Sequence, residues 1–408
     1  MTQQVSEHAR LRKILLIIVQ VVYRQFLKLR RVSVILDISS YFNFIRHHNY
    51  CRLQRKYTRF LTTTHALRMM LFMKNQNSTS PLPFPELGPE TVLNLVEEAL
   101  GVPCSNLCRQ LNSYINRVFE LETLDRKGLI VKFYRPERWS KIALQDEHDF
   151  LFELHEQEIP VIPPLQLVNG HTIGDYKDLF FSIFPYCGGR SSDEFTEDQW
   201  LEVGRLLGRC HAVGAVHPSR ERMVLAPKHS TRQQVDFILK SGVIRDKSQA
   251  IDFASVCNDL IKEISPLFAG ISSNRIHVDC YFSNMIYRPG ESFFIIDVVD
   301  MVMGPAIQDL WMLLPGPAKE SFLQISLFLE GYETFHAFDR RSFRLIEPLR
   351  AMRFLHYSAW LSYQFLADGS APLVPGFGSK EYWMVEISDL KDQLERIRQD
   401  DEPLGIFF

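Results

Sequence analysis

Residues 275–300, RIHVDCYFSNMIYRPGESFFIIDVVD, restrict the fold of this 408-residue chain more than any other stretch. They place His277, Asp279, Asn284 and Asp297 at short intervals among apolar side chains. Polar groups buried among apolar ones need partners, because their desolvation is otherwise costly. The apolar runs NMIYR and SFFIID lie on either side of the turn sequence PGE, which predicts a β-hairpin. We therefore expect this hairpin to bring Asn284 and Asp297 to the same end.

The part of the chain that precedes the hairpin has the pattern of a small antiparallel sheet with one main helix. A first helix is predicted at 89–100, because Pro89 suits its first position and Gly101 its end. The strand-like runs NRVFELE and LIVKFYRP then flank the turn DRKG. Ser140 caps the predicted main helix over 141–156, and the runs PPLQLVN and LFFSIFPY predict two more strands.

From Thr196 onward the sequence is helical apart from the hairpin. Thr196 and Gln199 form a capping-box pair at the start of a helix that extends to about residue 213. The predicted fold class is therefore α+β, with a β-rich small lobe over residues 79–185 and a larger, mostly helical lobe over residues 186–408. Further helices are predicted at 231–241, 249–269, 306–314, 319–334, 343–366 and 380–399.

Residues 1–78 form a basic extension of different character. The first 80 residues contain 14 lysine and arginine residues and only two acidic ones. The apolar run at 14–23 is shorter than the roughly 20 residues that span a bilayer, so we expect no transmembrane helix. Four interpretations remain open: a disordered extension, an amphipathic helix at a membrane surface, a nucleic-acid-binding arm, or sequence upstream of a true start at Met69, Met70 or Met73. Basic charge alone is a weak signal, so no nucleic-acid partner is expected.

The cysteines give no sign of a disulfide framework or a zinc site. The chain has seven, which is an odd number, and none forms a C-x-x-C pair. Cys104 and Cys108 have the i, i+4 spacing of two residues on one helical face, but zinc needs four ligands and no companion pair is present. The hydrophobic content of 46% is ordinary for a soluble globular protein. We therefore expect reduced thiols in a cytoplasmic protein.

Asp279, Asn284 and Asp297 match what phosphoryl transfer from ATP requires. One carboxylate must accept the proton of the attacking hydroxyl, and an amide oxygen with a second carboxylate must hold Mg²⁺ against the phosphates. The H-x-D-x-x-x-x-N spacing from His277 to Asn284 is that of a kinase catalytic loop. A lone aspartate is usually a turn former, and a lone histidine is usually a structural residue. The kinase hypothesis therefore rests on the four residues occurring together in this order.

The segments HVDCYFSNMIYR and FFIIDVVDMVMGPAIQDLWMLL resemble the catalytic segment of the aminoglycoside phosphotransferase and choline kinase-like superfamily. More closely, they resemble the bacterial stress response kinase A family of serine/threonine kinases. LNSYINRVFEL, VKFYRPERW, FPYCGGR and LGRCHAVG are also similar, so the resemblance covers about residues 87–408. It implies a two-lobed protein kinase-like fold, ATP and Mg²⁺, transfer to protein substrates or to the chain itself, and a monomer.

The resemblance also implies roles for individual residues. Asp279 matches the catalytic base, and Asn284 and Asp297 match the magnesium ligands, with Asp297 also counted as catalytic. Lys132 matches the lysine that holds the α- and β-phosphates, although an exposed strand lysine is the plainer interpretation. Glu147 matches the glutamate that pairs with this lysine, although it could equally be a solvated helix charge.

Other implied nucleotide contacts lie in two loops. Ser113 would belong to a phosphate-covering loop, which here lacks a Gly-x-Gly pattern. Backbone groups in a hinge would bind adenine, and Gly188 and Gly189 would permit the turn that follows. The hinge residues are Pro185, Tyr186 and Cys187.

Farther along the chain the implied roles are supporting ones. Asp309 would support the catalytic loop by hydrogen bonding. A late helix could face the substrate or serve only for packing and salt bridges, and it carries Arg350, Arg353, His356 and Trp360.

This chain departs from the family pattern next to the catalytic base. Val278 stands where the family usually has glycine, and Tyr281 and Phe282 are bulkier than the residues that usually follow the loop cysteine. No chemically required group is lost, but the acceptor stays open. Three functions remain: a serine/threonine protein kinase, a small-molecule kinase acting on an amino alcohol, sugar or antibiotic hydroxyl, and a nucleotide-binding scaffold without transfer.

Overall fold

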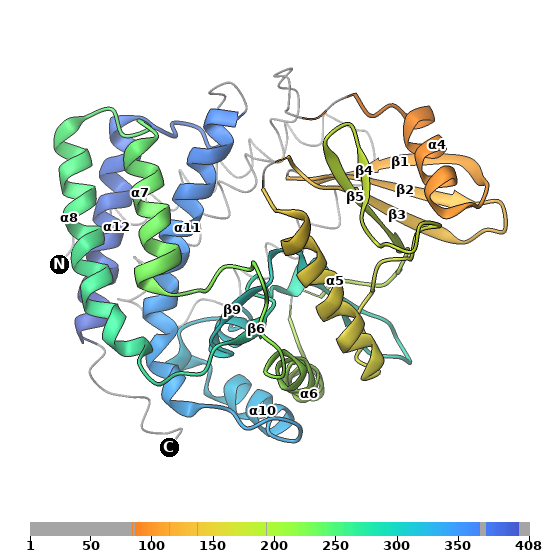
Figure 1. Ribbon diagram of the computed structural model, residues 1–408. Helices are drawn as coiled ribbons and strands as arrows, with labels where there is room; N and C mark the ends of the chain where they lie inside the picture. The colour runs from red at the N-terminus through yellow and green to blue at the C-terminus, as the bar shows by residue number, and fades with distance from the viewer. Residues whose placement is uncertain are drawn as a thin grey trace, which may run out of the picture. The chain divides into compact units, whose positions relative to one another are not determined.

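The computed structural model describes residues 84, 86–113, 115–136, 138–192, 194–367 and 373–399. The basic extension predicted at residues 1–78 lies outside these described residues. Within them, one five-stranded antiparallel sheet is followed by a larger, mostly helical part (Figure 1), which confirms the predicted α+β class. No helix in the described ranges combines the length and the apolar character needed to cross a membrane.

The sheet of the small part is covered on one face by helix α4, Pro89–Leu100. Alternation along a strand sends Leu129, Val131 and Phe133 to this covered face, where they pack in one core with Val96 of α4. The opposite face of the same strand therefore carries Lys132. In spatial order the strands are β1 Cys104–Leu111, β2 Arg117–Thr123, β3 Gly128–Phe133, β5 Leu179–Pro185 and β4 Gly174–Tyr176.

Two sequence predictions in this part were wrong. The run PPLQLVN at 163–169 is not a strand, because Pro163 and Pro164 have no N–H to donate, and strand β4 forms instead at Gly174–Tyr176. Cys104 and Cys108 do not share a helical face but lie on strand β1, which the sequence prediction missed. The pairing of β1 with β2 is irregular between these two cysteines, so β1 lacks the even alternation that identifies a strand.

The main helix of the small part and the first helix of the helical part begin at caps that the sequence predicted. Helix α5, Lys141–Glu156, is capped by Ser140, whose hydroxyl accepts a bond from the Ala143 amide. Helix α6, Glu197–Gly214, starts at the Thr196 capping box. Helices α7, α8, α11 and α12 lie side by side, and α10 packs against α6 (Figure 1). Their bounds are α7 Arg232–Lys240, α8 Lys247–Ile264, α9 Ile307–Trp311, α10 Phe322–Tyr332, α11 Ile346–Ala367 and α12 Lys380–Gln399.

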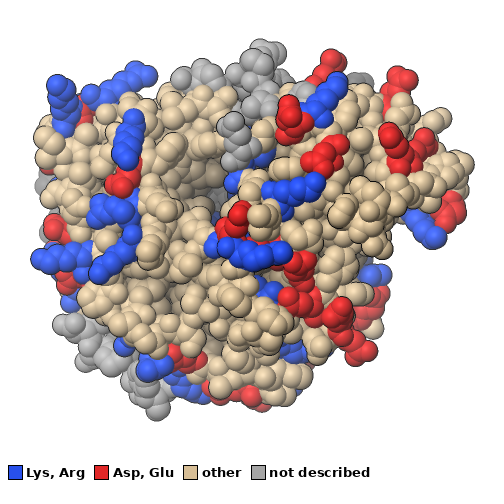
Figure 2. Space-filling view, in the orientation of Figure 1, with Lys and Arg blue, Asp and Glu red and all other residues tan. Residues whose placement is uncertain are grey.

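The hairpin predicted from the opening segment is present as strands β7, Met285–Tyr287, and β8, Phe293–Ile295. A second short pair, β6 Asn274–Ile276 and β9 Val302–Gly304, holds the two ends of the segment together. Basic and acidic side chains are interspersed on the face drawn in Figure 2.

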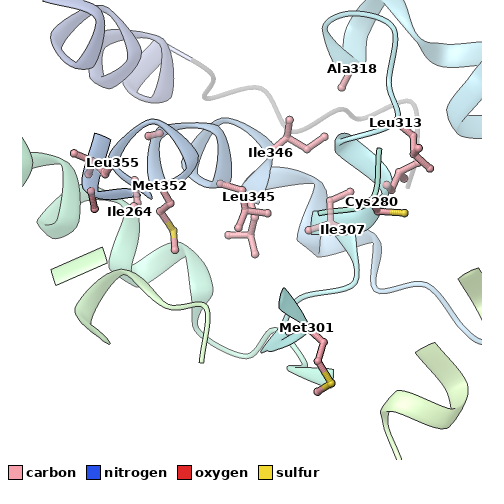
Figure 3. Packing of buried hydrophobic residues seen from close by; sticks show 14 of the residues in the cluster. Ile264, Cys280, Met301, Ile307, Leu313, Ala318, Leu345, Ile346, Met352 and Leu355 are labelled. Carbon is pink, nitrogen blue, oxygen red and sulfur yellow. The ribbon is translucent and has the colours of Figure 1, made fainter. Parts of the chain in front are cut away.

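The larger core extends from the helical bundle to the loop that carries Asp279. Cys280, the next residue, is 1% exposed and belongs to the same apolar cluster as Ile307 of α9 and Met352 of α11 (Figure 3). Burial raises the pKa of the Cys280 thiol well above its usual value, so the thiol is neutral and serves as an apolar anchor. This anchor fixes the backbone beside Asp279.

Candidate active site

Lys132 and Asp297 meet across the two parts of the fold. The Lys132 ammonium on β3 lies 2.9 Å from Oδ1 of Asp297, which follows β8. Burial disfavours the charged lysine, but Asp297 and Glu147 outweigh it, and the pKa of Lys132 lies above its usual value. Lys132 in turn lowers the pKa of Asp297 against the opposing effect of burial. Both groups are therefore charged at neutral pH, as a phosphate-binding cation and a metal-binding carboxylate must be.

The loop from His277 to Asn284 is held by hydrogen bonds that point inward. His277 Nε2 donates to the Ile296 carbonyl at 2.9 Å, and its Nδ1 accepts from the Asp279 amide at 3.3 Å. The Asn284 side-chain amide donates to the Asp279 carbonyl at 2.9 Å. With its N–H group used in this way, Asn284 keeps its side-chain oxygen for another ligand. His277 thus braces the loop, as the sequence predicted.

Asp309 of α9 ties this loop to the helical part. Its carboxylate accepts from the backbone amides of His277 and Val278, both at 2.8 Å, and lies 3.1 Å from Nε2 of His211 on α6. Asp309 is fully buried, so these donors replace the water that its charge would otherwise require. The supporting role predicted for Asp309 is confirmed.

Val278 adopts a backbone conformation that suits glycine. Its φ is 68°, in the left-handed region that β-branched residues rarely enter. Bonds from the Val278 amide to Asp309 and from the Gln308 side chain to the Val278 carbonyl hold it there. The glycine that the family usually has at this position is explained by this conformation.

We expect Val278→Gly to be more stable than Val278→Ala. At an ordinary position glycine is less stable than alanine by about 0.5–1 kcal/mol, because the unfolded chain gains more freedom. A non-glycine residue in the left-handed region costs about 1–3 kcal/mol, so here the order should reverse by about 1 kcal/mol. Urea unfolding of the two variants measures the difference, and an alanine variant that is equally or more stable would show that Val278 is unstrained.

Asp279 contacts a residue of the late helix α11. Its Oδ1 lies 2.7 Å from Nη2 of Arg353, and the same nitrogen lies 3.2 Å from the hydroxyl of Tyr281. Arg350, one turn earlier, pairs instead with Glu347 at 3.2 Å. Of the four α11 residues that the sequence left open, Arg353 is thus the one that reaches the predicted base.

Glu147 lies close to Arg222, which the sequence prediction missed. Their side chains are 2% and 0% exposed, and Oε2 of Glu147 lies 3.5 Å from the guanidinium. No direct Lys132–Glu147 pair occurs among the described contacts, where the lysine bonds to Asp297. Burial raises the pKa of Glu147 although Lys132 and Arg222 oppose it, so the two cations act on one buried carboxylate. No sequence motif identifies Arg222 as part of the site, because a single arginine in a loop is normally exposed.

Arg222→Ala should destabilise the fold by about 3–5 kcal/mol, because it removes the ion-pair partner of the buried Glu147 carboxylate. The Arg222 side chain also donates to the carbonyls of Ala143 and Val299 and stacks on Trp139 at 4.3 Å. Urea unfolding measures the effect.

The matched control for that prediction is Arg220→Ala. Arg220 is half-exposed, and its partner Asp146 keeps two backbone donors, so a loss of about 1 kcal/mol is expected. Equal losses in the two variants would contradict the buried-charge explanation.

Ser113 lies in the connection between β1 and β2, at the position expected for a phosphate-covering loop. No described contact joins it to the Lys132–Asp297 pair. The connection is attached to Arg135, whose side chain donates to the Ile115 carbonyl at 3.1 Å and to Gln364 of α11 at 2.5 Å. The loop is therefore linked to the helical part as well as to the sheet.

Pro185 is the last residue of β5, and Tyr186 and Cys187 lead from it into the helical part. The Tyr186 amide already donates to the Gly128 carbonyl at 2.9 Å, and proline has no N–H. The Cys187 amide is thus the donor that remains in the hinge, beside the carbonyls of all three residues. Gly189 is needed for space, because a Cβ there would lie 1.8 Å from a methyl carbon of Ile286 on β7.

The residues present fit a magnesium ion. Magnesium prefers few hard protein oxygens and takes the rest from phosphate and water. The side-chain oxygen of Asn284 and the second carboxylate oxygen of Asp297 have no partner among the described contacts. The described residues contain no cluster of three or more His, Cys, Asp or Glu side chains that could hold a metal.

Comparisons with known proteins show the family of this chain. The phosphotransferase enzyme family matches residues 108–346. Stress response kinase A of Salmonella choleraesuis (strain SC-B67) is 34% identical over 319 residues, which are 78% of this chain and 95% of that protein. Serine/threonine protein kinase RdoA of Salmonella typhimurium matches at 34% identity over the same shares.

One solved structure with the same fold is amicoumacin kinase hAmiN in complex with AMP-PNP, Ca2+ and Ami. It covers 75% of this chain and 93% of its own, with a TM-score of 0.60 and 17% identity, which shows the fold alone. The family match and the curated relatives go further, because each covers more than half of the chain. The chain therefore belongs to the phosphotransferase enzyme family and, within it, to the stress response kinase A family.

Proposed function

We propose that this phosphotransferase is a serine/threonine protein kinase that transfers the γ-phosphate of ATP to protein hydroxyls in a bacterial stress response. The observation that carries the proposal is the convergence of Lys132, Asp279, Asn284 and Asp297 on the β7–β8 hairpin. The relatives named stress response kinase A and serine/threonine protein kinase support the acceptor class and the stress role.

Each of the four residues has one proposed task. Lys132 binds the α- and β-phosphates, and Asn284 and Asp297 hold Mg²⁺, which when bound neutralises charge on the phosphates. Asp279 accepts the proton of the acceptor hydroxyl. The hydroxyl oxygen bonds to the γ-phosphorus, the bond from that phosphorus to the β–γ bridging oxygen breaks, and ADP leaves.

The remaining nucleotide contacts are proposed for the small lobe and the hinge. Glu147 stabilises the charged form of Lys132 from a greater distance than that of a direct ion pair. The loop of Ser113 covers the phosphates with its amides and hydroxyl. Adenine takes its donor from the Cys187 amide and its acceptor from the carbonyl of Pro185 or Tyr186.

The proposed organisation assigns nucleotide binding to residues 79–185 and catalysis to residues 186–408. We propose a monomer that acts in the cytoplasm, where ATP is available, on other proteins and on itself, without a nucleic-acid partner. The six cysteines of the described residues are free thiols, which suits that compartment.

A small-molecule kinase is the second candidate, because the fold neighbour hAmiN is named a kinase of amicoumacin. A transfer assay with radiolabelled ATP and Mg²⁺ separates the two candidates. One arm offers a protein mixture and the chain itself, and the other offers amino alcohols, sugars and aminoglycosides. We expect label in protein bands that chelation of Mg²⁺ abolishes. Efficient labelling of a small alcohol without any labelled protein would overturn the proposal.

A further inference from the structure

The face of Asp279 that lies toward α11 is occupied by Arg353. Its Nη2 contacts both Asp279 and Tyr281, and its guanidinium carbon lies 5.6 Å from the centre of the Tyr281 ring. The side chains of Arg353 and Asp279 are 27% and 30% exposed, so both remain accessible to another molecule. All described hydrogen bonds of Arg353 use Nη2, so the N–H groups of Nε and Nη1 have no partner among the described contacts.

Apart from Asp279, the described ionisable neighbours add no net charge beside Arg353. His356, one turn later on α11, bonds through Nδ1 to the Gln234 side chain at 2.9 Å, and burial lowers its pKa to about 4. It is therefore neutral at pH 7. Across from α11, Arg138 is paired with Asp300 at 2.5 Å, so these two charges offset each other.

This arrangement distinguishes between classes of acceptor. An ammonium group of an amino alcohol or aminoglycoside, brought to Asp279, would also lie near the Arg353 guanidinium, which offsets the attraction that the carboxylate alone would exert. A carboxylate would be attracted and could accept a charge-assisted hydrogen bond from the Nε or Nη1 group of Arg353. Stacking on Tyr281 holds the guanidinium in place for such a contact.

We propose that Arg353 is an acceptor-binding residue that receives the carboxylate of an acidic side chain next to the accepting serine or threonine. The inference rests on the proposed function and adds its substrate class, which is acidic protein segments. Because Arg353 touches the base and an extended chain advances about 3.3–3.6 Å per residue, the carboxylate belongs within about two positions of the hydroxyl.

The test uses one pool of serine and threonine peptides made in three versions, with Glu, Gln or Lys on both sides of the acceptor. The full-length wild type, Arg353→Gln and Arg350→Gln are compared by kcat/KM with each version, and ATP binding confirms folding. Arg350 is the matched control, because it lies on the same helix but pairs with Glu347. For each enzyme, kcat/KM with the Glu peptides is divided by kcat/KM with the Lys peptides. An effect of Arg353 on Asp279 that changes the rate with every peptide equally drops out of this ratio.

We expect the wild type and Arg350→Gln to prefer the Glu peptides over the Lys peptides by about tenfold to a hundredfold. In Arg353→Gln this ratio should fall at least tenfold, mainly through a higher KM for the Glu peptides. A wild type without charge preference, or a preference that Arg353→Gln keeps, overturns the inference while the proposed function stands.

Besides the three peptide versions, small hydroxy acids and amino alcohols are offered as acceptors. They show whether a failure concerns the further inference, the proposed function or both. Transfer to hydroxy acids but to no peptide would overturn the proposed protein kinase and support an anion-binding Arg353, provided that Arg353→Gln raises their KM. Transfer to amino alcohols alone, or to nothing at all, would overturn both.

Discussion

Asp279→Asn is expected to lower the rate of phosphoryl transfer by about 10²–10⁴-fold, the contribution typical of a positioned general base. The replacement has the same shape, and the bond from Asn284 uses the Asp279 backbone carbonyl, which stays in place. An asparagine oxygen can still accept from Arg353. The fold and the affinity for ATP should therefore be unchanged, and the loss should appear in kcat.

Single-turnover transfer and ATP binding, measured on the same protein, check this prediction. Asp252→Asn, which removes an exposed carboxylate on α8, is the control and should keep full activity. Transfer within a few-fold of wild type in Asp279→Asn would assign the proton acceptor to another group. An equal loss of ATP binding and of transfer would show instead that Asp279 holds the structure of the site.

The elements with local signals were predicted correctly from the sequence. The Ser140 cap and the Thr196–Gln199 capping box are bonds closed within one helical turn, and both are present. The β7–β8 hairpin follows from two apolar runs and a turn between them. In each case the residues that determine the element are neighbours in the chain, so one short window contains the whole signal.

Elements and contacts that depend on distant partners could not be predicted in this way. Strand β1 has no regular alternation, and it is defined by its pairing with β2. The contact between Asp279 and Arg353 joins residues 74 positions apart, and nothing near Arg353 distinguishes it from Arg350 before the helix is placed. The motif spacing thus predicted which loop residues form the candidate site, while their electrostatic surroundings came only from the fold.

Asp297→Asn is expected to abolish the dependence of nucleotide binding on Mg²⁺ and to lower transfer by about 10³-fold. Asp297 has a φ of 57°, a left-handed conformation that asparagine also tolerates, so the backbone after β8 should be preserved. Asparagine can still accept a bond from Lys132, but it supplies no negative charge to a metal. Without the metal, the variant should bind ATP at least as tightly as the wild type, because a carboxylate that repels the phosphates has been removed.

ATP titrations with Mg²⁺ and with a chelator test this loss of Mg²⁺ dependence. The wild type should bind ATP more tightly with Mg²⁺, and the affinity of the variant for ATP should not change with it. Asp300→Asn is the matched control, because Asp300 lies three residues later and its carboxylate pairs with Arg138. It should keep the Mg²⁺ response of the wild type. A variant at Asp297 that still responds to Mg²⁺ would place the metal on other ligands. A response lost in both variants would mean that the whole segment after β8, and not Asp297 alone, determines metal binding.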